Sequence, residues 1–113
     1  MGGRKEKNPK LRMIHRIILL HQAELDIEGA YDWYENQSSG LGQEFLRNVE
    51  ACLALIKRNP EIYSVVYRNF RRGLVRRFPF AIFYEREAND LVIYAVFHCS
   101  QDPVKWKKRL RIA

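Results

Sequence analysis

Cysteines, long apolar runs and metal-binding spacings are scarce in this chain of 113 residues. The two cysteines, Cys52 and Cys99, are too few for a disulfide framework and lack the spacing of metal ligands, so we expect free thiols and a cytoplasmic location. The longest apolar stretches have about eight residues, whereas a membrane-spanning helix needs roughly 20. No signal-peptide pattern follows the basic start. His15 and His21 are isolated, so we expect neither a metal site nor a cofactor.

Charge, by contrast, is abundant and unevenly placed, with a net charge of +7. Residues 1–12 carry +4, residues 13–64 carry −4 and residues 65–113 carry +7. The first segment has almost nothing to bury, so we predict a disordered basic leader over 1–12 and one folded domain over 13–113. The basic last segment favours a polyanionic partner, either nucleic acid or an acidic protein segment, and a basic surface kept for solubility is the alternative.

The spacing of the apolar residues predicts two helices, over residues 23–37 and 41–58. Ser38-Ser39-Gly40 between them is a short link, which favours an antiparallel helical hairpin with one shared apolar seam. Asn59-Pro60 ends the second helix. Trp33 lies off the main apolar stripe of the first helix and is therefore a candidate to face a partner.

The rest of the domain has the pattern of strands, which we predict over residues 14–20, 70–78, 80–86 and 91–98. A turn over 87–90 separates the last two, with Asn89 or Asp90 suited to a left-handed backbone. Asp102-Pro103 has the pattern of a helix start, before a short helix over 104–111. The order β-α-α-β-β-β-α predicts an α+β domain, with the helical hairpin packed on a mostly antiparallel sheet.

Basic residues concentrate in two places. Five arginines lie on and before the predicted strand 70–78, where side-chain alternation places Arg72 and Arg76 on one face and Arg71 and Arg77 on the other. Guanidinium groups suit phosphate or carboxylate, and protection of an edge strand is the alternative role. The predicted binding residues are Arg68, Arg71, Arg72, Arg76 and Arg77, together with Lys105, Lys107, Lys108 and Arg109 of the last helix.

His98 ends the last predicted strand, beside this basic face. A histidine in this place is a candidate general acid or base for RNA cleavage, with an arginine stabilising the phosphorane. The alternative is a histidine at the sheet rim that hydrogen-bonds to the backbone. No carboxylate lies at an evident catalytic spacing from it. Trp106 could stack on a base, but its spacing to Leu110 favours a role in anchoring the last helix to the sheet.

Several short motifs occur together over residues 14–110. They are Ala23-Glu24-Leu25-Asp26-Ile27 with Trp33-Tyr34, Gly40-Leu41-Gly42 with Phe45, Asn59-Pro60 with Tyr63, Arg76-Arg77-Phe78-Pro79-Phe80 with Ile82 and Tyr84, and Ala95-Val96-Phe97-His98 followed by Asp102-Pro103 and Trp106. In this combination the chain resembles the RelE/ParE superfamily of toxins from type II toxin–antitoxin systems, also called plasmid stabilisation proteins. The fold known for that superfamily agrees with the predicted order of elements.

The resemblance implies a growth-inhibiting toxin that is neutralised by a cognate antitoxin, commonly one with a ribbon-helix-helix domain, in an oligomeric toxin–antitoxin complex. ParE-like members poison DNA gyrase and are not nucleases, whereas RelE-like members cleave mRNA on the ribosome. The Arg-Arg-Phe-Pro-Phe run and the Asp-Pro-x-x-Trp ending favour the ParE-like reading. The alternative is an endoribonuclease, because Arg77 and His98 fall roughly where some RelE-like nucleases keep an arginine and a histidine. A degenerate toxin that only binds its antitoxin is a third possibility.

Overall fold

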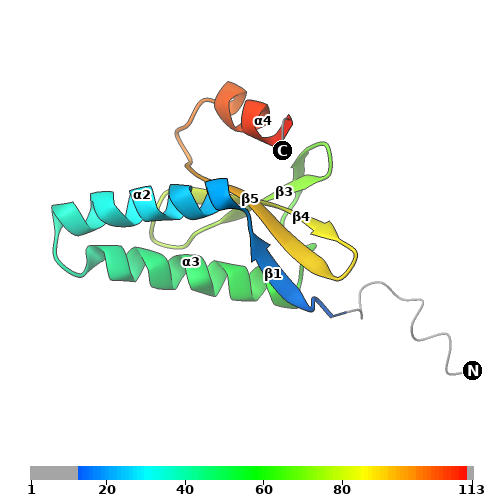
Figure 1. The fold of residues 1–113 in the computed structure, drawn as a ribbon, viewed down its shortest axis with the longest axis horizontal. Helices are drawn as coiled ribbons and strands as arrows, with labels where there is room; N and C mark the ends of the chain where they lie inside the picture. The colour runs from blue at the N-terminus through cyan, green and yellow to red at the C-terminus, as the bar shows by residue number, and fades with distance from the viewer. Residues whose placement is uncertain (1–12, 112–113) are drawn as a thin grey trace, which may run out of the picture.

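The computed structural model describes residues 13–111, so the predicted leader over 1–12 lies outside the described residues. Within that range the elements are β1 (Arg16–Leu19), α2 (His21–Gln37), α3 (Leu41–Arg58), β2 (Val65–Tyr67), β3 (Phe70–Leu74), β4 (Phe80–Glu87), β5 (Asp90–His98) and α4 (Pro103–Arg111) (Figure 1). The predicted α+β class and element order are confirmed, with β2 as an additional short strand. Both helices of the predicted hairpin are present, and α3 has the bounds expected for it.

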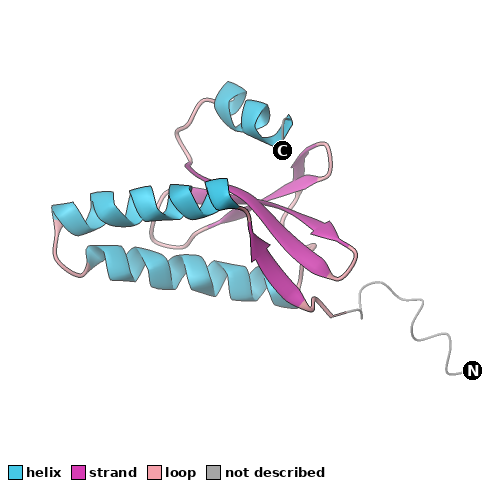
Figure 2. Ribbon diagram, in the orientation of Figure 1, coloured by secondary structure: helices cyan, strands magenta, loops and turns pink. Residues whose placement is uncertain are grey.

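The five strands form one mixed sheet in the order β1-β5-β4-β3-β2. β1 runs parallel to β5, and the other neighbouring pairs are antiparallel. The α2–α3 hairpin packs on one face of this sheet and α4 on the other (Figure 2). The sheet therefore separates a larger core under the hairpin from a smaller one under α4. No helix in residues 13–111 is long and apolar enough to cross a membrane.

Alternating side chains of β4 supply both cores. Ile82 and Tyr84 are buried on the hairpin side, whereas Ala81 and Phe83 are buried on the α4 side. Trp106 of α4 stacks on Phe83 with 4.8 Å between the ring centroids, so its predicted role as a core anchor is confirmed. Such contact removes apolar area of both rings from water, which is the main force holding a short helix to a sheet.

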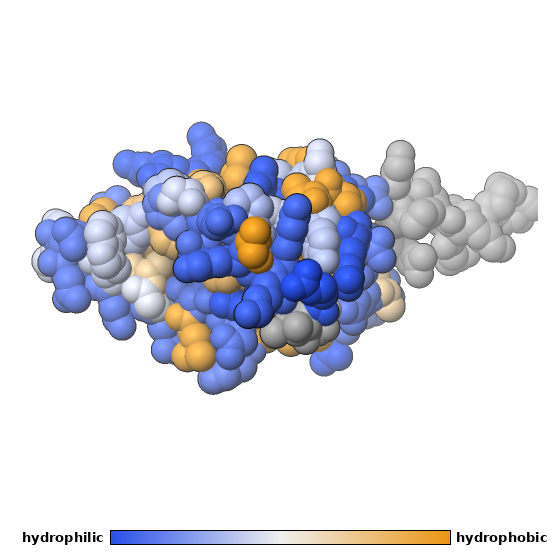
Figure 3. Space-filling view, turned by 90° about the horizontal axis from the view of Figure 1, so that it is seen from above, coloured by the Kyte–Doolittle hydropathy of each residue, from blue (hydrophilic) through white to orange (hydrophobic). Residues whose placement is uncertain are grey.

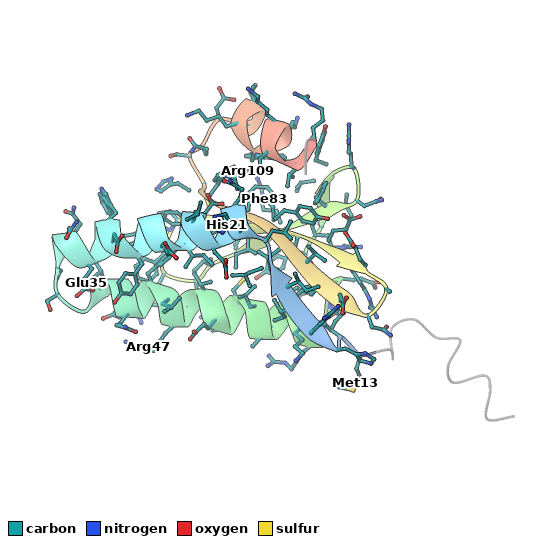
Figure 4. The ribbon with its side chains drawn as sticks, viewed as in Figure 1. Met13, His21, Glu35, Arg47, Phe83 and Arg109 are labelled. Atoms are coloured by element: carbon teal, nitrogen blue, oxygen red, sulfur yellow. The ribbon has the colours of Figure 1, made fainter. Side chains whose placement is uncertain are left out.

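The turn of the helical hairpin depends on close approach of the two helices. A Cβ atom at Gly42 would lie 2.9 Å from the carbonyl oxygen of Tyr31, so only glycine fits without displacing backbone. The Glu35 carboxylate accepts hydrogen bonds of 2.9 Å from the N–H groups of both Gly40 and Gly42. A residue of α2 thus caps the start of α3, where free N–H groups and the helix dipole favour negative charge. Figure 4 shows Glu35 at this end of the hairpin.

The predicted strand over residues 70–78 is wrong beyond Leu74, where β3 ends. The N–H of Val75 donates to the carbonyl oxygen of Phe80 at 2.9 Å, which closes a loop over 76–79. Val75 and Phe78 turn into the hairpin-side core, and Arg77 takes a left-handed φ of 71°. The loop forms because burial of these two side chains outweighs continued strand pairing. The expected face-sharing of Arg72 with Arg76 therefore does not occur.

The predicted turn between β4 and β5 is present, but its left-handed residue is neither Asn89 nor Asp90. Glu87 pairs with Asp90, so the turn has two central residues, and Ala88 takes the positive φ of 57°. Two-residue hairpins require positive φ at their first central position, because that backbone twist matches the twist of the strands. The geometry of the turn therefore outweighs the intrinsic preference of the residue types.

Beyond the end of β1, the free edge of β5 forms a hydrogen bond with a side chain in place of a neighbouring strand. β1 pairs only with residues 90–93 of β5. A bulge follows at Tyr94, because Tyr84 of β4 pairs with Ile93 whereas the preceding Phe83 pairs with Ala95. The Val96 N–H then donates to Asp26 Oδ2 of α2 at 2.9 Å. The bulge turns the edge of β5 toward α2, and the Asp26 carboxylate takes the place of a strand partner.

The same Asp26 carboxylate holds α4 in place. Arg109 donates to both of its oxygens, at 2.9 and 3.0 Å, and also contacts the Tyr94 carbonyl oxygen at 3.4 Å. Figure 4 shows Arg109 between α4 and the start of α2. A bidentate pair of this kind is stronger than a single charged contact. Arg109, predicted as a binding residue, thus forms part of the fold, because its guanidinium is committed to a carboxylate inside the domain.

Replacing Arg109 with alanine tests this arrangement. The Asp26 side chain is only 12% exposed, so Arg109→Ala leaves a carboxylate largely out of water without its partner. We expect the free energy of unfolding to fall by about 3 kcal/mol, measured by urea denaturation. Lys108→Ala, at the exposed neighbouring position, is the control and should cost less than about 0.5 kcal/mol. Equal effects of the two changes would contradict the role given to the ion pair.

Tyr84 makes stability depend on alkaline pH. Its side chain is fully buried and its hydroxyl donates to the Pro60 carbonyl oxygen at 2.8 Å, and burial raises the pKa of this phenol from 10.0 to about 12. The unfolded chain therefore loses the proton before the folded chain does. The free energy of unfolding should fall between about pH 10 and pH 12, by on the order of 2 kcal/mol from this group. Urea unfolding across that range should show a shallower decline for Tyr84→Phe, and an unchanged decline would contradict the assignment.

Candidate functional site

The loop over 76–79 and the loop after β5 meet at one end of the sheet. Phe80, at the start of β4, pairs with His98 at the end of β5. One residue further out, the Cys99 N–H donates to the Pro79 carbonyl oxygen at 2.7 Å. The sheet therefore brings the loop that carries Arg77 beside His98, although 20 residues separate them in sequence. Sequence reasoning treated these two residues as one site, and they share one end of the fold.

His98 is exposed and tied to its own loop. Its Nδ1 accepts a hydrogen bond from the Ser100 N–H at 3.0 Å and lies 2.7 Å from Ser100 Oγ. Its ring meets Phe80 edge-on, with 5.2 Å between the centroids. Among residues 13–111, no carboxylate forms a hydrogen bond or ion pair with it. These contacts are those of a histidine at a sheet rim, held by the backbone.

An apolar pocket opens beside His98. Its volume is about 480 Å³, and it is lined by Ala30, Trp33 and Tyr34 of α2 and by Pro79, Phe80 and His98 of the sheet end. Trp33 is 59% exposed there, as expected from its position off the buried stripe. Its indole meets the Tyr34 ring edge-on at 5.1 Å, so the side chain is supported although it is not covered. A supported but exposed tryptophan beside an apolar pocket is the arrangement that protein partners bind most strongly.

The arginines of the basic segment do not form one row. Arg68 lies in the β2–β3 turn, with a positive φ of 52° and its guanidinium 5.2 Å above the Tyr67 ring. Arg71 is half-buried and donates to the Tyr63 carbonyl oxygen at 2.6 Å. Both therefore lie at the opposite end of β3 from Arg76 and Arg77. Arg72, between them, is exposed and faces the α4 side, because it alternates with the inward Gly73.

Helix α4 carries the second predicted group of cations. Its start is capped as predicted, because the Val104 N–H donates to Asp102 Oδ1 at 2.9 Å. Lys105, Lys107 and Lys108 are exposed, and Lys107 Nζ lies 5.6 Å from the Trp106 ring. The face seen in Figure 3, which includes α4, is mostly hydrophilic with a few separate apolar side chains. This surface is suited to steering an acidic partner rather than to burying a large apolar area.

A second recess was not foreseen from the sequence. It lies between α3 and the end of β3, has a volume of about 250 Å³, and has both Arg58 and Arg76 in its lining. Arg58 was not among the binding residues predicted from the sequence. No periodicity in sequence connects residues 58 and 76, so only the packing of α3 on the sheet could have shown the pair. Within residues 13–111 there is no group of three or more side chains suited to a metal ion.

Comparison with known proteins agrees with this fold. A protein-family profile described as ParE toxin of type II toxin-antitoxin system, parDE, matches residues 17–103. The chain is similar to a structure of the chromosomal ParDE toxin–antitoxin system from P. aeruginosa, with a TM-score of 0.67, 11% identity, and coverage of 75% of this chain and 96% of that one. It is also similar to the RelBE2 toxin–antitoxin complex from Mycobacterium tuberculosis, with a TM-score of 0.54, 15% identity, and coverage of 79% and 95%.

No curated protein sequence matches the chain significantly. The family profile nevertheless spans most of β1 to the first residue of α4, which includes the helical hairpin, the arginines over 68–77 and His98. The structural matches have low sequence identity, so they support the fold alone. The resemblance read from the sequence motifs is thereby confirmed, on its ParE-like side. The chain belongs to the ParE toxin family of type II toxin–antitoxin systems.

Proposed function

We propose that this toxin inhibits growth by binding DNA gyrase as a protein partner and that a cognate antitoxin, of the ribbon-helix-helix kind, neutralises it. The observation that carries the gyrase proposal is the apolar pocket beside the exposed Trp33. Protein interfaces concentrate their binding free energy in a few aromatic and arginine side chains at such pockets. Arg77, in the loop that leads to Pro79 at the pocket, adds positive charge for an acidic partner surface.

The distribution of the arginines also supports a protein partner. A nucleic-acid strand is bound through a continuous series of phosphate contacts, which requires a basic track. Here Arg68 and Arg71 lie at the opposite end of β3 from Arg76 and Arg77, and Arg71 is committed to a backbone carbonyl. His98 has a hydrogen bond to Ser100 in place of a carboxylate partner that would orient it as a base.

Ribosome-dependent mRNA cleavage is the second candidate function. It is favoured by one observation, namely that the hydrogen bond from Cys99 to Pro79 brings the loop of Arg77 beside His98. In that case His98 exchanges a proton with the ribose or the leaving oxygen, and Arg77 stabilises the charge on phosphorus. These two residues are then the catalytic pair.

The two candidates are separated by assaying the purified toxin on gyrase supercoiling and on translated mRNA side by side. We expect Trp33→Ala to weaken gyrase inhibition by about thirtyfold, because a tryptophan at the centre of an interface contributes on the order of 2 kcal/mol. Leu25→Ala is the matched control, since Leu25 is exposed on the same helix but does not line the pocket. His98 also lines the pocket, so the discriminating readout for His98→Ala is mRNA cleavage, which the gyrase proposal expects in neither this variant nor the wild-type chain.

Other results would contradict this assignment. Cleavage of translated mRNA by the wild-type chain that is lost in His98→Ala would replace it with the nuclease. Absence of both activities, with antitoxin binding intact and no growth arrest on expression, would leave a binding module that has lost its toxicity.

A further inference from the structure

The recess between α3 and β3 is lined by one stripe of α3 side chains. On the α3 side, Asn48, Ala51, Leu55 and Arg58 line it, at spacings of three and four residues that place them on one stripe of the helix. Ten residues of α-helix extend roughly 15 Å. The recess is therefore an elongated groove, with small or apolar side chains along the middle of the stripe and polar ones at its two ends.

The sheet side of the groove runs beside this stripe in the opposite direction. Gly73 packs on Ile56, where an added Cβ would lie 2.9 Å from Ile56 Cδ1. One residue later, the carbonyl oxygen of Leu74 accepts a contact of 3.6 Å from Cys52 Sγ. The chain thus advances toward the N-terminal end of α3, so Arg76 lies nearer the Asn48 end, away from Arg58.

The middle of the groove is apolar and open to solvent. Leu55 and Tyr63 line it and are half-buried, whereas Leu74 contributes its backbone, because its side chain alternates with the inward Gly73 and faces the α4 side. The Tyr63 hydroxyl donates to the Leu74 carbonyl oxygen at 3.4 Å. This hydrogen bond satisfies the hydroxyl, so the Tyr63 side chain offers the groove the apolar surface of its ring. Burial raises the pKa of the Cys52 thiol, so the floor of the groove stays uncharged at neutral pH. A branched aliphatic side chain would gain free energy by covering this surface.

The two ends are positively charged and unneutralised. Neither Arg58 nor Arg76 forms an ion pair with an acid of residues 13–111. Guanidinium groups bind carboxylates with paired hydrogen bonds. The apolar middle of the groove offers no favourable contact to the phosphates of a nucleic acid. The arrangement, positive then apolar then positive, is therefore complementary to a peptide in which an apolar residue lies between acidic ones.

We propose that this groove binds a short segment of the antitoxin in which a branched apolar residue is flanked on both sides by carboxylates. The proposal rests on the proposed antitoxin partner and specifies which part of the toxin the antitoxin engages and with what chemistry. Arg58 and Arg76 bind the two flanking acids, and Leu55 and the Tyr63 ring contact the apolar residue between them. The groove shares no lining residue with the Trp33 pocket, so the two surfaces are separable by mutation.

A defined peptide tests the proposal without knowledge of the antitoxin. The probe is a synthetic hexapeptide Glu-Asp-Leu-Ile-Glu-Asp, titrated into the full ¹⁵N-labelled chain at low salt and followed by amide chemical shifts. We expect the shifts to concentrate at Ala51, Leu55 and Leu74 and to saturate at millimolar peptide. The Gln-Asn-Leu-Ile-Gln-Asn and Glu-Asp-Gly-Ser-Glu-Asp peptides, which lack the acids or the apolar pair, should each bind about tenfold more weakly.

Charge reversal provides the second arm. The Arg58→Glu/Arg76→Glu double variant should bind the acidic peptide at least about tenfold more weakly, because two attractive contacts become repulsive. Arg47→Glu is the matched control, since Arg47 is exposed on α3 but does not line the groove, and it should change the affinity by less than about twofold (Figure 4). Leu55→Ser tests the apolar contact without reversing a charge.

Three outcomes would overturn the proposal: no shift at millimolar peptide, shifts centred elsewhere on the chain, or equal binding by the wild-type chain and the double variant. Gyrase inhibition by the wild-type chain is measured separately. Peptide binding in the groove without gyrase inhibition would remove the target proposed above and leave the groove assignment intact. Gyrase inhibition with no peptide bound in the groove would remove the groove assignment and leave the proposed target intact.

Discussion

The carboxylate of Asp26 holds together three parts of the domain. It accepts a hydrogen bond from the β5 backbone at Val96 and a bidentate pair from Arg109 of α4, and it projects from α2. Without it, the edge of β5 beyond β1 would have an unpaired N–H, and α4 would be held mainly by its apolar contacts. A backbone N–H away from water is costly without an acceptor, and a buried carboxylate is costly without a positive partner. Asp26 supplies the acceptor for Val96, and Arg109 supplies the positive partner for Asp26.

This constraint acts at the end of the sheet where the Trp33 pocket lies. β5 stays paired with β4 as far as His98, and the Cys99 N–H beyond it holds the loop at Pro79, which lines the pocket. The groove of Arg58 and Arg76 is formed independently, by α3 packing on β3. A ParE-family toxin needs to be recognised both by a target and by an antitoxin. The two surfaces proposed for these roles are separate, one apolar and aromatic and the other bounded by arginines.

The sequence was sufficient for features that depend on local pattern. The bounds of α3, the cap of α4 by Asp102 and the two faces of β4 follow from periodicity and cap chemistry, which involve residues close in the chain. The loop at Arg76 and Arg77 was mistaken for strand, because burial of Val75 and Phe78 is a tertiary effect. Arg109 was assigned to the surface for the same reason, since its partner Asp26 is 83 residues away. The groove that has Arg58 and Arg76 in its lining likewise exists only once α3 is packed on the sheet.

The central claim is that Asp26 completes the sheet and secures α4, and exchange of the Val96 amide proton tests it most directly. In the native chain this proton should exchange as slowly as those of the interior strand β4, because the hydrogen bond to Asp26 replaces the missing strand partner. In Asp26→Ala, folded under the same conditions, its exchange should accelerate by at least about a hundredfold relative to amides of β4. Fast exchange of Val96 in the native chain, or no change in the variant, would contradict the account.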